Sequence, residues 1–382
     1  MIPPPPAAAV DAPATAATVR VDRARLELRH GRAIALRAAE SGPWQLVAAI
    51  ETLDAQRLQE FRSLGLPLRL LLTAERLNAL RDDVAALQPM ALALPNDVTL
   101  AQLQSLAALA SDDDATPPLH GALPADAAHH AALALAKRAR LAPALLLAEL
   151  PRQGGGEWQR WLDDAQLLRL SAADLVNATQ PGSALRRVSD AHVPIEAAEN
   201  CQVVLYREVE GDCEHLAIIV GQPALDRPVP VRLHSACLTG DLLGSLRCDC
   251  GEQLRGAAER LAVDGGVLLY LAQEGRGTGL ASKLRAYRLQ DAGLDTLQAD
   301  RYLGFRADER DFQAAAAMLH DLGIQRIRLL TNNPHKIDAL RRAGIEVVDR
   351  LPSNVPVNGH NQRYMQTKQD LAGHWRADDR TA

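Results

Sequence analysis

Residues 234–251 read HSACLTGDLLGSLRCDCG and place Cys237, Cys248 and Cys250 within fourteen positions. Thiolates at such spacing are typical zinc ligands. Zinc with three protein ligands keeps its fourth position for water and acts as a catalyst, whereas zinc with four is usually structural. The other two cysteines, Cys201 and Cys213, lie well before this segment. The pattern therefore favours a catalytic zinc site with three thiolate ligands.

Two other interpretations of the cysteines stay open at this point. His234 lies three positions before Cys237 and could close the site as a structural centre with three Cys and one His. The cysteines could also hold no metal. Ligand number and spacing favour the open site over both.

The bulk composition limits the class of protein. A chain of 382 residues predicts two domains, and a net charge of −5 argues against a general nucleic-acid binder. An odd number of cysteines at ligand-like spacing fits a reducing compartment. The N-terminus MIPPPPAAAVDAPATAATVR lacks the basic start and apolar run of a secretory signal, and no run of 18 apolar residues occurs. We expect a cytoplasmic protein without a nucleic-acid or membrane partner.

The composition changes near residue 190, which predicts two domains of mixed α/β class. In the first half, apolar spacing predicts helices at 58–64, 77–87 and 131–140, strands at 33–36, 68–72 and 145–147, and exposed loops at 111–118 and 153–157. In the second half it predicts strands at 216–220, 229–233, 267–271, 327–331 and 345–348, and helices at 250–261, 280–293, 309–322 and 334–343. We expect domains at 20–180 and 191–375, a linker at 181–190 within the loop-like stretch 177–194, and tails at 1–19 and 376–382.

Two loops of the second half suit an anionic ligand. In QEGRGTGL, residues 273–280, three glycines let backbone N–H groups approach a phosphate, and Arg276 can pair with its oxygens, although a plain turn is equally compatible. TNNPHK, residues 331–336, opens a helix, whose N-terminus favours an anion beside Lys336. A simple helix cap by Asn332 or Asn333 is compatible with the same sequence.

Together these motifs resemble the GTP cyclohydrolase II family. The resemblance runs from about Val188 to His374 and includes LHSACLTGDLLGSLRCDCGEQL, QEGRGTGL, LRAYRLQDAGLDT, LGFRADERDF and RLLTNNPHK in order. It implies one zinc per chain on Cys237, Cys248 and Cys250. It implies that Asp308 accepts a proton, that Arg310 is a nucleophile toward the α-phosphate and that Tyr287 takes part in catalysis. The GTP contacts that it implies are Arg232, Leu233, His234, Ser235, Ala236, Gln253, Glu274, Gly275, Arg276, Thr296, Thr331 and Lys336.

The resemblance also implies a reaction. GTP and water would give formate, pyrophosphate and 2,5-diamino-6-(5-phosphoribosylamino)pyrimidin-4(3H)-one, the first step of riboflavin biosynthesis, with Mg²⁺ on the triphosphate and a homodimeric enzyme. Because a guanidinium stays protonated, Arg310 could equally clamp the phosphate by charge. One position departs from the family, since Ala236 stands where a Glu usually precedes the first zinc cysteine. This departure keeps two alternatives open, a relative acting on another nucleotide and a non-catalytic zinc module.

The first half resembles, more faintly, 3,4-dihydroxy-2-butanone-4-phosphate synthase, over the stretch from RARLELRHGR to LLTAERLNAL. That family binds Mg²⁺ on an acid-rich loop and uses a histidine. Here the loop RAAESGPWQ, residues 37–45, has Glu40 as its only acid, and Ala128 takes the place of the histidine. Without clustered carboxylates a hard cation has no ligands. We therefore expect a domain that is inactive as a synthase and serves as a scaffold or dimerisation unit.

Overall fold

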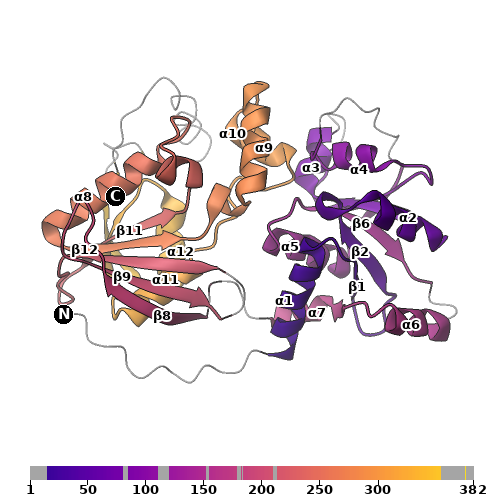
Figure 1. The fold of residues 1–382 in the computed structure, drawn as a ribbon, viewed down its shortest axis with the longest axis horizontal. Coiled ribbons are helices and arrows are strands. Elements are labelled where there is room, and N and C mark those ends of the chain that lie inside the picture. Colours follow the sequence, from indigo (N-terminus) through magenta and orange to yellow (C-terminus); the bar gives the residue numbers. More distant parts are fainter. Residues whose placement is uncertain are drawn as a thin grey trace. The chain divides into compact units, whose positions relative to one another are not determined.

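The computed structural model describes residues 15–80, 85–110, 120–151, 155–178, 182, 184–209, 213–353 and 375. The chain forms two compact units, each built on a seven-stranded sheet (Figure 1). The N-terminal unit comprises Thr15–Ala178 together with Ala281–Asp308. The C-terminal unit comprises Thr179–Leu280 and Glu309–Ala382. The predicted mixed α/β class with two sheet-based parts is confirmed.

The sheet of the N-terminal unit has the order β5-β4-β3-β6-β2-β1-β7 and is antiparallel except at the β1–β7 pair. Its strands are β1 (Ile34–Arg37), β2 (Gln45–Ala49), β3 (Leu68–Leu72), β4 (Met90–Ala93), β5 (His120–Pro124), β6 (Ala144–Glu149) and β7 (Arg169–Ser171). Its helices are α1 (Ala16–Arg29), α2 (Ala55–Ser63), α3 (Ala74–Leu80), α4 (Leu100–Leu106), α5 (Ala127–Arg138), α6 (Gly155–Asp164) and α7 (Ala172–Asn177), joined by α9 (Leu280–Asp291) and α10 (Thr296–Tyr302).

Both faces of this sheet are covered by helices, as the uninterrupted apolar strand β6 shows. Leu145 and Leu147 pack into a core with α1, α5 and α7, whereas Leu146 and Ala148 pack into a second core with α2, α3, α4 and α6. Successive side chains of a strand point to opposite faces, so a strand between two helical layers must be apolar throughout. Ala, Leu and Val fill both cores, consistent with the low aromatic content of 3%.

The sheet of the C-terminal unit has the order β14-β13-β11-β12-β10-β9-β8, with β14, β13, β11 and β12 parallel and the other pairs antiparallel. Its strands are β8 (Leu185–His192), β9 (Cys201–Glu208), β10 (Glu214–Val220), β11 (Val229–Ser235), β12 (Gly266–Leu271), β13 (Arg326–Leu330) and β14 (Glu346–Leu351). Its helices are α8 (Cys250–Asp264), α11 (Gln313–Asp321) and α12 (Pro334–Arg342).

The alternation along the strands decides which side chains meet α8. Val231 and Leu233 of β11 pack into the core that contains α11 and α12, whereas Leu268 of β12 packs against α8 in a separate core. Arg232 and His234 alternate with the first set and therefore lie on the α8 side of the sheet. Strand β11 thus delivers two of the predicted ligand-binding side chains to the face where the cysteines lie.

Several boundaries differ from those predicted. Residues 185–192 of the predicted linker stretch form β8, which pairs with β9. The sequence predicted a loop here because the side chains of this strand alternate only weakly between apolar and polar. Helix α1 begins at Ala16 within the predicted tail, since Thr15 caps it. Helix α6 begins at Gly155 within a predicted loop, and the helix predicted from residue 309 begins at Gln313. The predicted loop at 111–118 and most of the predicted tails lie outside the described residues. Among the described residues, no helix is long and apolar enough to cross a membrane.

Candidate metal and nucleotide site

The three clustered cysteines converge at the end of β11 and the start of α8. Cys237 follows β11 and precedes a π-type turn at Leu238–Leu242, and Cys250 is the first residue of α8. The three Sγ atoms lie within 4.8 Å of one another, and those of Cys237 and Cys248 are 3.7 Å apart. Within the described parts of the chain, no other group of three or more His, Cys, Asp or Glu ligand atoms is gathered in this way. The fold thus produces the trio that the sequence predicted.

Gly240 leaves the room in which the sulfurs meet. A Cβ atom at this position would lie 2.9 Å from Cys248 Sγ, 3.0 Å from Cys237 Sγ and 2.9 Å from Cys250 Cβ. The backbone N–H of Gly240 also donates a hydrogen bond to Cys237 Sγ at 3.3 Å. Gly251 is equally constrained, because a Cβ there would lie 2.3 Å from the carbonyl oxygen of Gly240. Both glycines are required for the close approach of the turn to α8.

The chemistry of this donor set fits zinc. Thiol hydrogen bonding, chiefly with Cys237, raises the pKa of Cys248, and thiol hydrogen bonds with Cys237 and Cys248 raise that of Cys250 well above its ordinary value. Three sulfurs this close resist sharing negative charge without a cation between them. Zinc binds thiolates at about 2.3 Å with tetrahedral geometry. The sulfur–sulfur distances in such a site are close to the distance between the sulfurs of Cys237 and Cys248.

Asp241 organises the groups around the cluster. Its carboxylate accepts hydrogen bonds from the backbone N–H of Cys237 at 2.9 Å and from the Tyr270 hydroxyl at 2.9 Å. It also lies 3.0 Å from Nε2 of His234, whose ring stacks on Tyr270. Burial lowers the pKa of His234 although Asp241 opposes the shift. The ring nitrogen that faces Asp241 is therefore engaged there, and His234 is not a member of the sulfur group.

The sequence did not single out Asp241, Tyr270 or Gly240. The available signal was the position of an acidic residue four places after Cys237, inside the turn that the cysteines bracket. A carboxylate at that spacing can bond back to the N–H of the ligand residue. Such supporting groups orient metal ligands and tune their basicity.

Replacing Asp241 by Asn is expected to weaken zinc binding by about 10- to 100-fold, because the side chain keeps its shape but loses the charge that supports Cys237 and His234. Competition with a chromophoric chelator measures the affinity. Asp264→Asn, at the exposed last turn of α8, is the control and should leave the affinity unchanged. Equal affinity in Asp241→Asn and the unaltered protein would show that this carboxylate does not support the site.

Arg232 brings an unusual charge to the α8 side of the sheet. Its side chain is 4% exposed, and burial lowers the pKa of its guanidinium. Nη1 donates to the carbonyl of Leu330 at 3.0 Å and Nη2 to Oε1 of Gln253 at 2.5 Å, while Nε has no partner among the described residues. The buried hydroxyl of Ser235 likewise has none. Because buried polar atoms without a partner are costly, these two atoms are candidates to bind a ligand.

The glycine-rich loop lies against the same region. Gly275, Arg276 and Gly277 have φ of +62°, +57° and +91°, so the loop follows a left-handed path that strains Arg276. A Cβ at Gly277 would lie 2.9 Å from the carbonyl oxygen of Glu309. Glu274 accepts a hydrogen bond from the backbone N–H of Leu238 at 2.6 Å, which joins the loop to the cysteine turn. Such a strained backbone persists only where surrounding contacts hold it, and it is common at ligand sites.

Phe312 links two further predicted residues and was not predicted itself. Its ring lies 5.6 Å from the guanidinium carbon of Arg310 and 5.7 Å from Nζ of Lys336. Lys336 is buried, with 6% of its surface exposed, and its ammonium donates a hydrogen bond to the carbonyl of Leu233 at 2.8 Å. The backbone N–H of Asn333 donates to Thr331 Oγ1 at 3.0 Å. The helix cap predicted at Asn333 forms as well, because its side chain accepts from the N–H of His335.

The remaining predicted positions are placed as follows. The N–H of Ala236 donates to the carbonyl of Leu271, so this residue continues the sheet. Tyr287, Thr296 and Asp308 belong to the N-terminal unit, where Tyr287 lies on α9 beneath Lys283 and Thr296 is the first residue of α10. The predicted site residues that belong to the C-terminal unit are Arg232, Leu233, His234, Ser235, Ala236, Cys237, Cys248, Cys250, Gln253, Glu274, Gly275, Arg276, Arg310, Thr331 and Lys336.

The acid-poor loop of the N-terminal unit holds no carboxylate cluster among the described residues. Glu40 forms an ion pair with Arg37, and Ala128 of α5 is buried in the hydrophobic core between this helix and the sheet. Its neighbour His129 is bound as a helix cap, since Nδ1 accepts a hydrogen bond from the N–H of Asp126 at 3.0 Å. Neither position is arranged for hard-cation chemistry.

His129 gives the N-terminal unit a pH-dependent stability. Burial lowers the pKa of its imidazole, so the unfolded chain binds a proton that the folded unit resists. We expect the free energy of unfolding to decrease as the pH falls below about 6.5. His129→Gln should flatten this dependence, because Gln can make the same capping contact without titrating. Urea unfolding between pH 5 and 8 measures it, with exposed His130→Gln as the control; an unchanged slope in His129→Gln would contradict this assignment.

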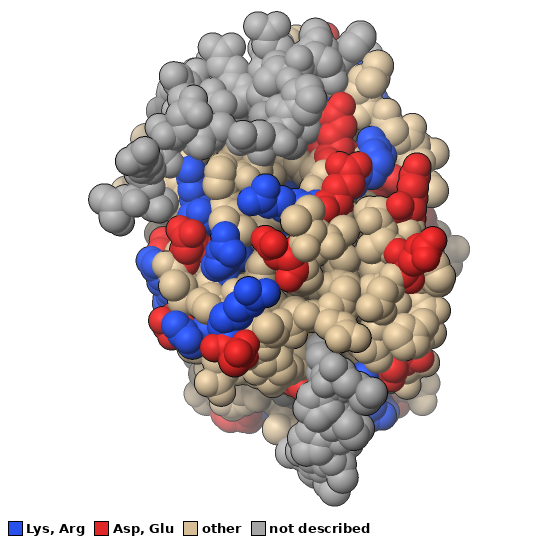
Figure 2. Space-filling view, turned by 90° about the vertical axis from the view of Figure 1, so that its left-hand side faces the viewer, with Lys and Arg blue, Asp and Glu red and all other residues tan. Residues whose placement is uncertain are grey.

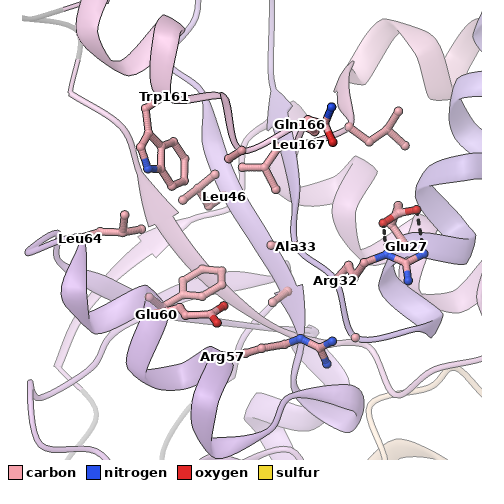
Figure 3. A pocket seen from close by; sticks show the side chains of 15 residues that line it. Glu27, Arg32, Ala33, Leu46, Arg57, Glu60, Leu64, Trp161, Gln166 and Leu167 are labelled. Carbon is pink, nitrogen blue, oxygen red and sulfur yellow. Dashed lines mark hydrogen bonds and ion pairs between the residues drawn. The ribbon is translucent and has the colours of Figure 1, made fainter. Parts of the chain in front are cut away.

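A cavity of about 320 Å³ lies between α2 and α6 of the N-terminal unit (Figure 3). Leu46, Leu64 and Trp161 line its apolar part, while Arg32 at its edge pairs with Glu27. The two arginines of the lining, Arg32 and Arg57, are both ion-paired, and its acids form no metal-binding cluster, so the cavity lacks the ligands of a divalent cation with a sugar phosphate. On the face of the C-terminal unit that Figure 2 shows, acidic side chains lie among the basic ones instead of leaving a uniformly basic surface.

Comparison with known proteins identifies the family of this chain. The family model described as GTP cyclohydrolase II matches residues 186–352. A GTP cyclohydrolase-2 of Azospirillum brasilense is 43% identical over 365 residues, which is 94% of each chain. A GTP cyclohydrolase-2 of Xylella fastidiosa is 40% identical over 360 residues, 94% of this chain and 87% of that one. The riboflavin biosynthesis protein RibBA of Synechocystis is 43% identical over 254 residues, 64% of this chain and 46% of that one.

Among solved structures, RibBX of A. baumannii, a two-domain 3,4-dihydroxy-2-butanone 4-phosphate synthase, is 19% identical with a TM-score of 0.34, covering 88% of this chain and 100% of that one. This similarity is too distant to decide the fold. The full-length relatives, with the family model over the C-terminal half, decide the membership. The chain belongs to the GTP cyclohydrolase II family and is a hydrolase.

Proposed function

We propose that this enzyme is a zinc-dependent GTP cyclohydrolase II that converts GTP and water to formate, pyrophosphate and 2,5-diamino-6-(5-phosphoribosylamino)pyrimidin-4(3H)-one, the first step of riboflavin biosynthesis. The observation that carries the proposal is the group of three sulfurs within 4.8 Å of one another. Arg232 Nε and Ser235 Oγ, on the strand that leads to Cys237, are buried without a hydrogen-bond partner among the described residues and could bind a ligand. Relatives that match 94% of the chain are named for this activity.

Cys237, Cys248 and Cys250 would hold the metal. Bound zinc supplies a Lewis acid that lowers the pKa of water to about 7, which suits hydrolysis at C8 of the purine. The sulfur group of the described residues contains no fourth protein ligand, and His234 faces Asp241. These contacts favour an open coordination position over a closed structural centre.

The other residues would bind and orient the nucleotide. The loop at 274–277 and the start of α12 at Lys336 present N–H groups and cations suited to a triphosphate carrying Mg²⁺. Arg232 and Ser235 would contact the substrate near the cysteines, with Gln253 fixing the arginine. By resemblance to the family, Tyr287 would take part in catalysis, Thr296 would contact GTP and Asp308 would accept a proton. We also propose a cytoplasmic homodimer whose N-terminal unit is inactive as a synthase.

The role of Arg310 can be decided by substitution. Its guanidinium lies 5.6 Å from the Phe312 ring, a contact that favours a fixed positive charge. We expect Arg310→Lys to retain activity within about 10- to 100-fold, and Arg310→Met to lose about 1,000-fold, because a charge clamp needs only a cation. Release of pyrophosphate from GTP measures both. Equal, complete loss in the two variants would instead favour attack by the guanidinium itself.

A second candidate is hydrolysis of another purine or pyrimidine nucleotide, which Ala236 favours because a carboxylate beside the metal is missing. The deciding experiment incubates the protein with GTP, Zn²⁺ and Mg²⁺ and measures formate and pyrophosphate. Both products in equal amounts are expected. Turnover of a different nucleotide with none from GTP would favour the second candidate, and inertness toward all nucleotides with zinc bound would contradict both.

A further inference from the structure

The chain that follows β12 contacts both neighbours of the first cysteine in the sulfur group. The backbone N–H of Ala236 donates a hydrogen bond to the carbonyl of Leu271 at 2.8 Å. On the other side of Cys237, the N–H of Leu238 donates to the carboxylate of Glu274 at 2.6 Å. All five residues belong to the C-terminal unit. What holds the chain between Leu271 and Glu274 therefore also helps to hold Cys237.

His215 of β10 holds this segment, residues 271–274, from the sheet. It is buried, with 1% of the residue exposed, and its Nδ1 accepts a hydrogen bond from the N–H of Ala272 at 3.1 Å. Nε2 of the same ring lies 3.2 Å from Oε1 of Glu208. Because a backbone N–H can only donate, Nδ1 carries no proton, and the neutral ring has its proton on Nε2, which donates to Glu208. Glu208 thus favours the tautomer that the contact with Ala272 requires.

Tyr206 of β9 makes a comparable buried contact at the same place in the sheet. It lies directly opposite His215 in the β9–β10 pair and is also 1% exposed. Its hydroxyl donates to the carboxylate of Asp321 in α11 at 2.6 Å, within the core that covers this face. The two contacts differ in where they end. That of Tyr206 ends on a helix of the core, whereas that of His215 ends on the segment beside Cys237.

We propose that His215 is a positioning residue which, oriented by Glu208, fixes segment 271–274 and thereby places Cys237 and the start of the glycine-rich loop. The inference rests on the proposed function, from which it takes zinc at the cysteines and GTP at the loop. His215 acts through the backbone of this segment and is not a member of the sulfur group. Removing a group that orients metal ligands in this way typically changes metal affinity or activity by about 10- to 100-fold.

Two substitutions in the full-length enzyme separate the two contacts of the ring. In His215→Asn, the amide oxygen is as many bonds from the backbone as Nδ1 and can accept from the N–H of Ala272. In His215→Gln, the amide lies one bond further out, at the place of Nε2, and keeps the contact with Glu208 instead. We expect His215→Gln to weaken zinc binding about 10-fold and to raise KM for GTP about 10-fold, and His215→Asn to change each by less than about 3-fold. Chelator competition measures the zinc affinity, and formate release gives KM and kcat.

Glu208→Met and Tyr206→Phe complete the set of variants. Glu208→Met leaves the ring in place but removes the carboxylate that selects its tautomer, so we expect a change of about 3-fold in zinc affinity and KM, in the same direction as in His215→Gln. Tyr206→Phe is the matched control, because it removes an equally buried hydrogen bond directly opposite His215. It should lower the stability toward urea and leave zinc affinity and KM unaltered.

The order of the variants decides the inference. Gln conserves the volume of the ring better than Asn, so an effect of packing alone predicts the larger loss in His215→Asn. That order, a loss of the same size in Tyr206→Phe, or no loss in His215→Gln would overturn the inference. If His215→Gln does not fold, Glu208→Met against Tyr206→Phe makes the same comparison. Zinc affinity is measured without GTP, so the expected order of zinc affinities in a protein that does not hydrolyse GTP would support the role of His215 and contradict only the proposed function.

Discussion

Replacing Cys248 by Ser is expected to remove the bound zinc and to lower GTP hydrolysis by about 1,000-fold or more, because two thiolates cannot hold the catalytic metal and a serine hydroxyl stays protonated. Cys248 Sγ lies 3.7 Å from Cys237 Sγ, so the substitution removes one corner of the ligand set without changing the volume of the turn. Plasma mass spectrometry gives zinc per chain, and formate release gives the rate.

Cys213→Ser is the matched control for this result. Cys213 is a half-buried thiol at the start of β10 that does not belong to the sulfur group. Its zinc content and activity should equal those of the unaltered enzyme. One zinc per chain and undiminished turnover in Cys248→Ser would mean that the metal, or the chemistry, resides elsewhere.

Replacing Gly240 by Ala is expected to be nearly as severe as losing a ligand. The added methyl would lie 2.9 Å from Cys248 Sγ and 3.0 Å from Cys237 Sγ, inside the space that the sulfurs share. Because neighbouring Gly251 is itself packed against the Gly240 carbonyl, the turn has no direction in which to yield. We expect zinc affinity to fall by about 100-fold or more, with activity lost in proportion.

Gly256→Ala provides the comparison. Gly256 lies on α8, and a Cβ there meets no atom within 4 Å. Since Ala is favoured over Gly in a helix by about 1 kcal/mol, this variant should be as active and slightly more stable. Chelator competition on the pair of variants isolates the effect of volume at the metal site. Similar zinc affinities in the two would refute the view that Gly240 holds the ligands together.

The metal cluster was predictable because its residues are close in sequence and chemically unambiguous. Cys237, Cys248 and Cys250 needed only a strand end and a helix start to meet, and both were readable from apolar runs. Strands β11 and β12 and helices α8 and α12 were predicted close to their observed limits for the same reason.

What the sequence missed depended on contacts between distant residues. Strand β8 forms because β9 lies beside it, and its weak alternation gives little local signal. Asp241 became visible only when its partners Tyr270 and His234 came together in space. The attachment of α9–α10 to the N-terminal unit rests on Arg76, whose partner Tyr302 is 226 positions away. Burial of such a cation cannot be read from local pattern.

The measurement that tests the account most directly is the absorption spectrum of the cobalt-substituted enzyme, with and without GTP. Cobalt at a tetrahedral site with three thiolates gives intense visible bands that respond to the fourth ligand. We predict that GTP, but not ATP, shifts these bands, because the remaining position is open to water and substrate. A spectrum that indicates a fourth protein ligand and stays unchanged at saturating GTP would contradict a catalytic role for the metal.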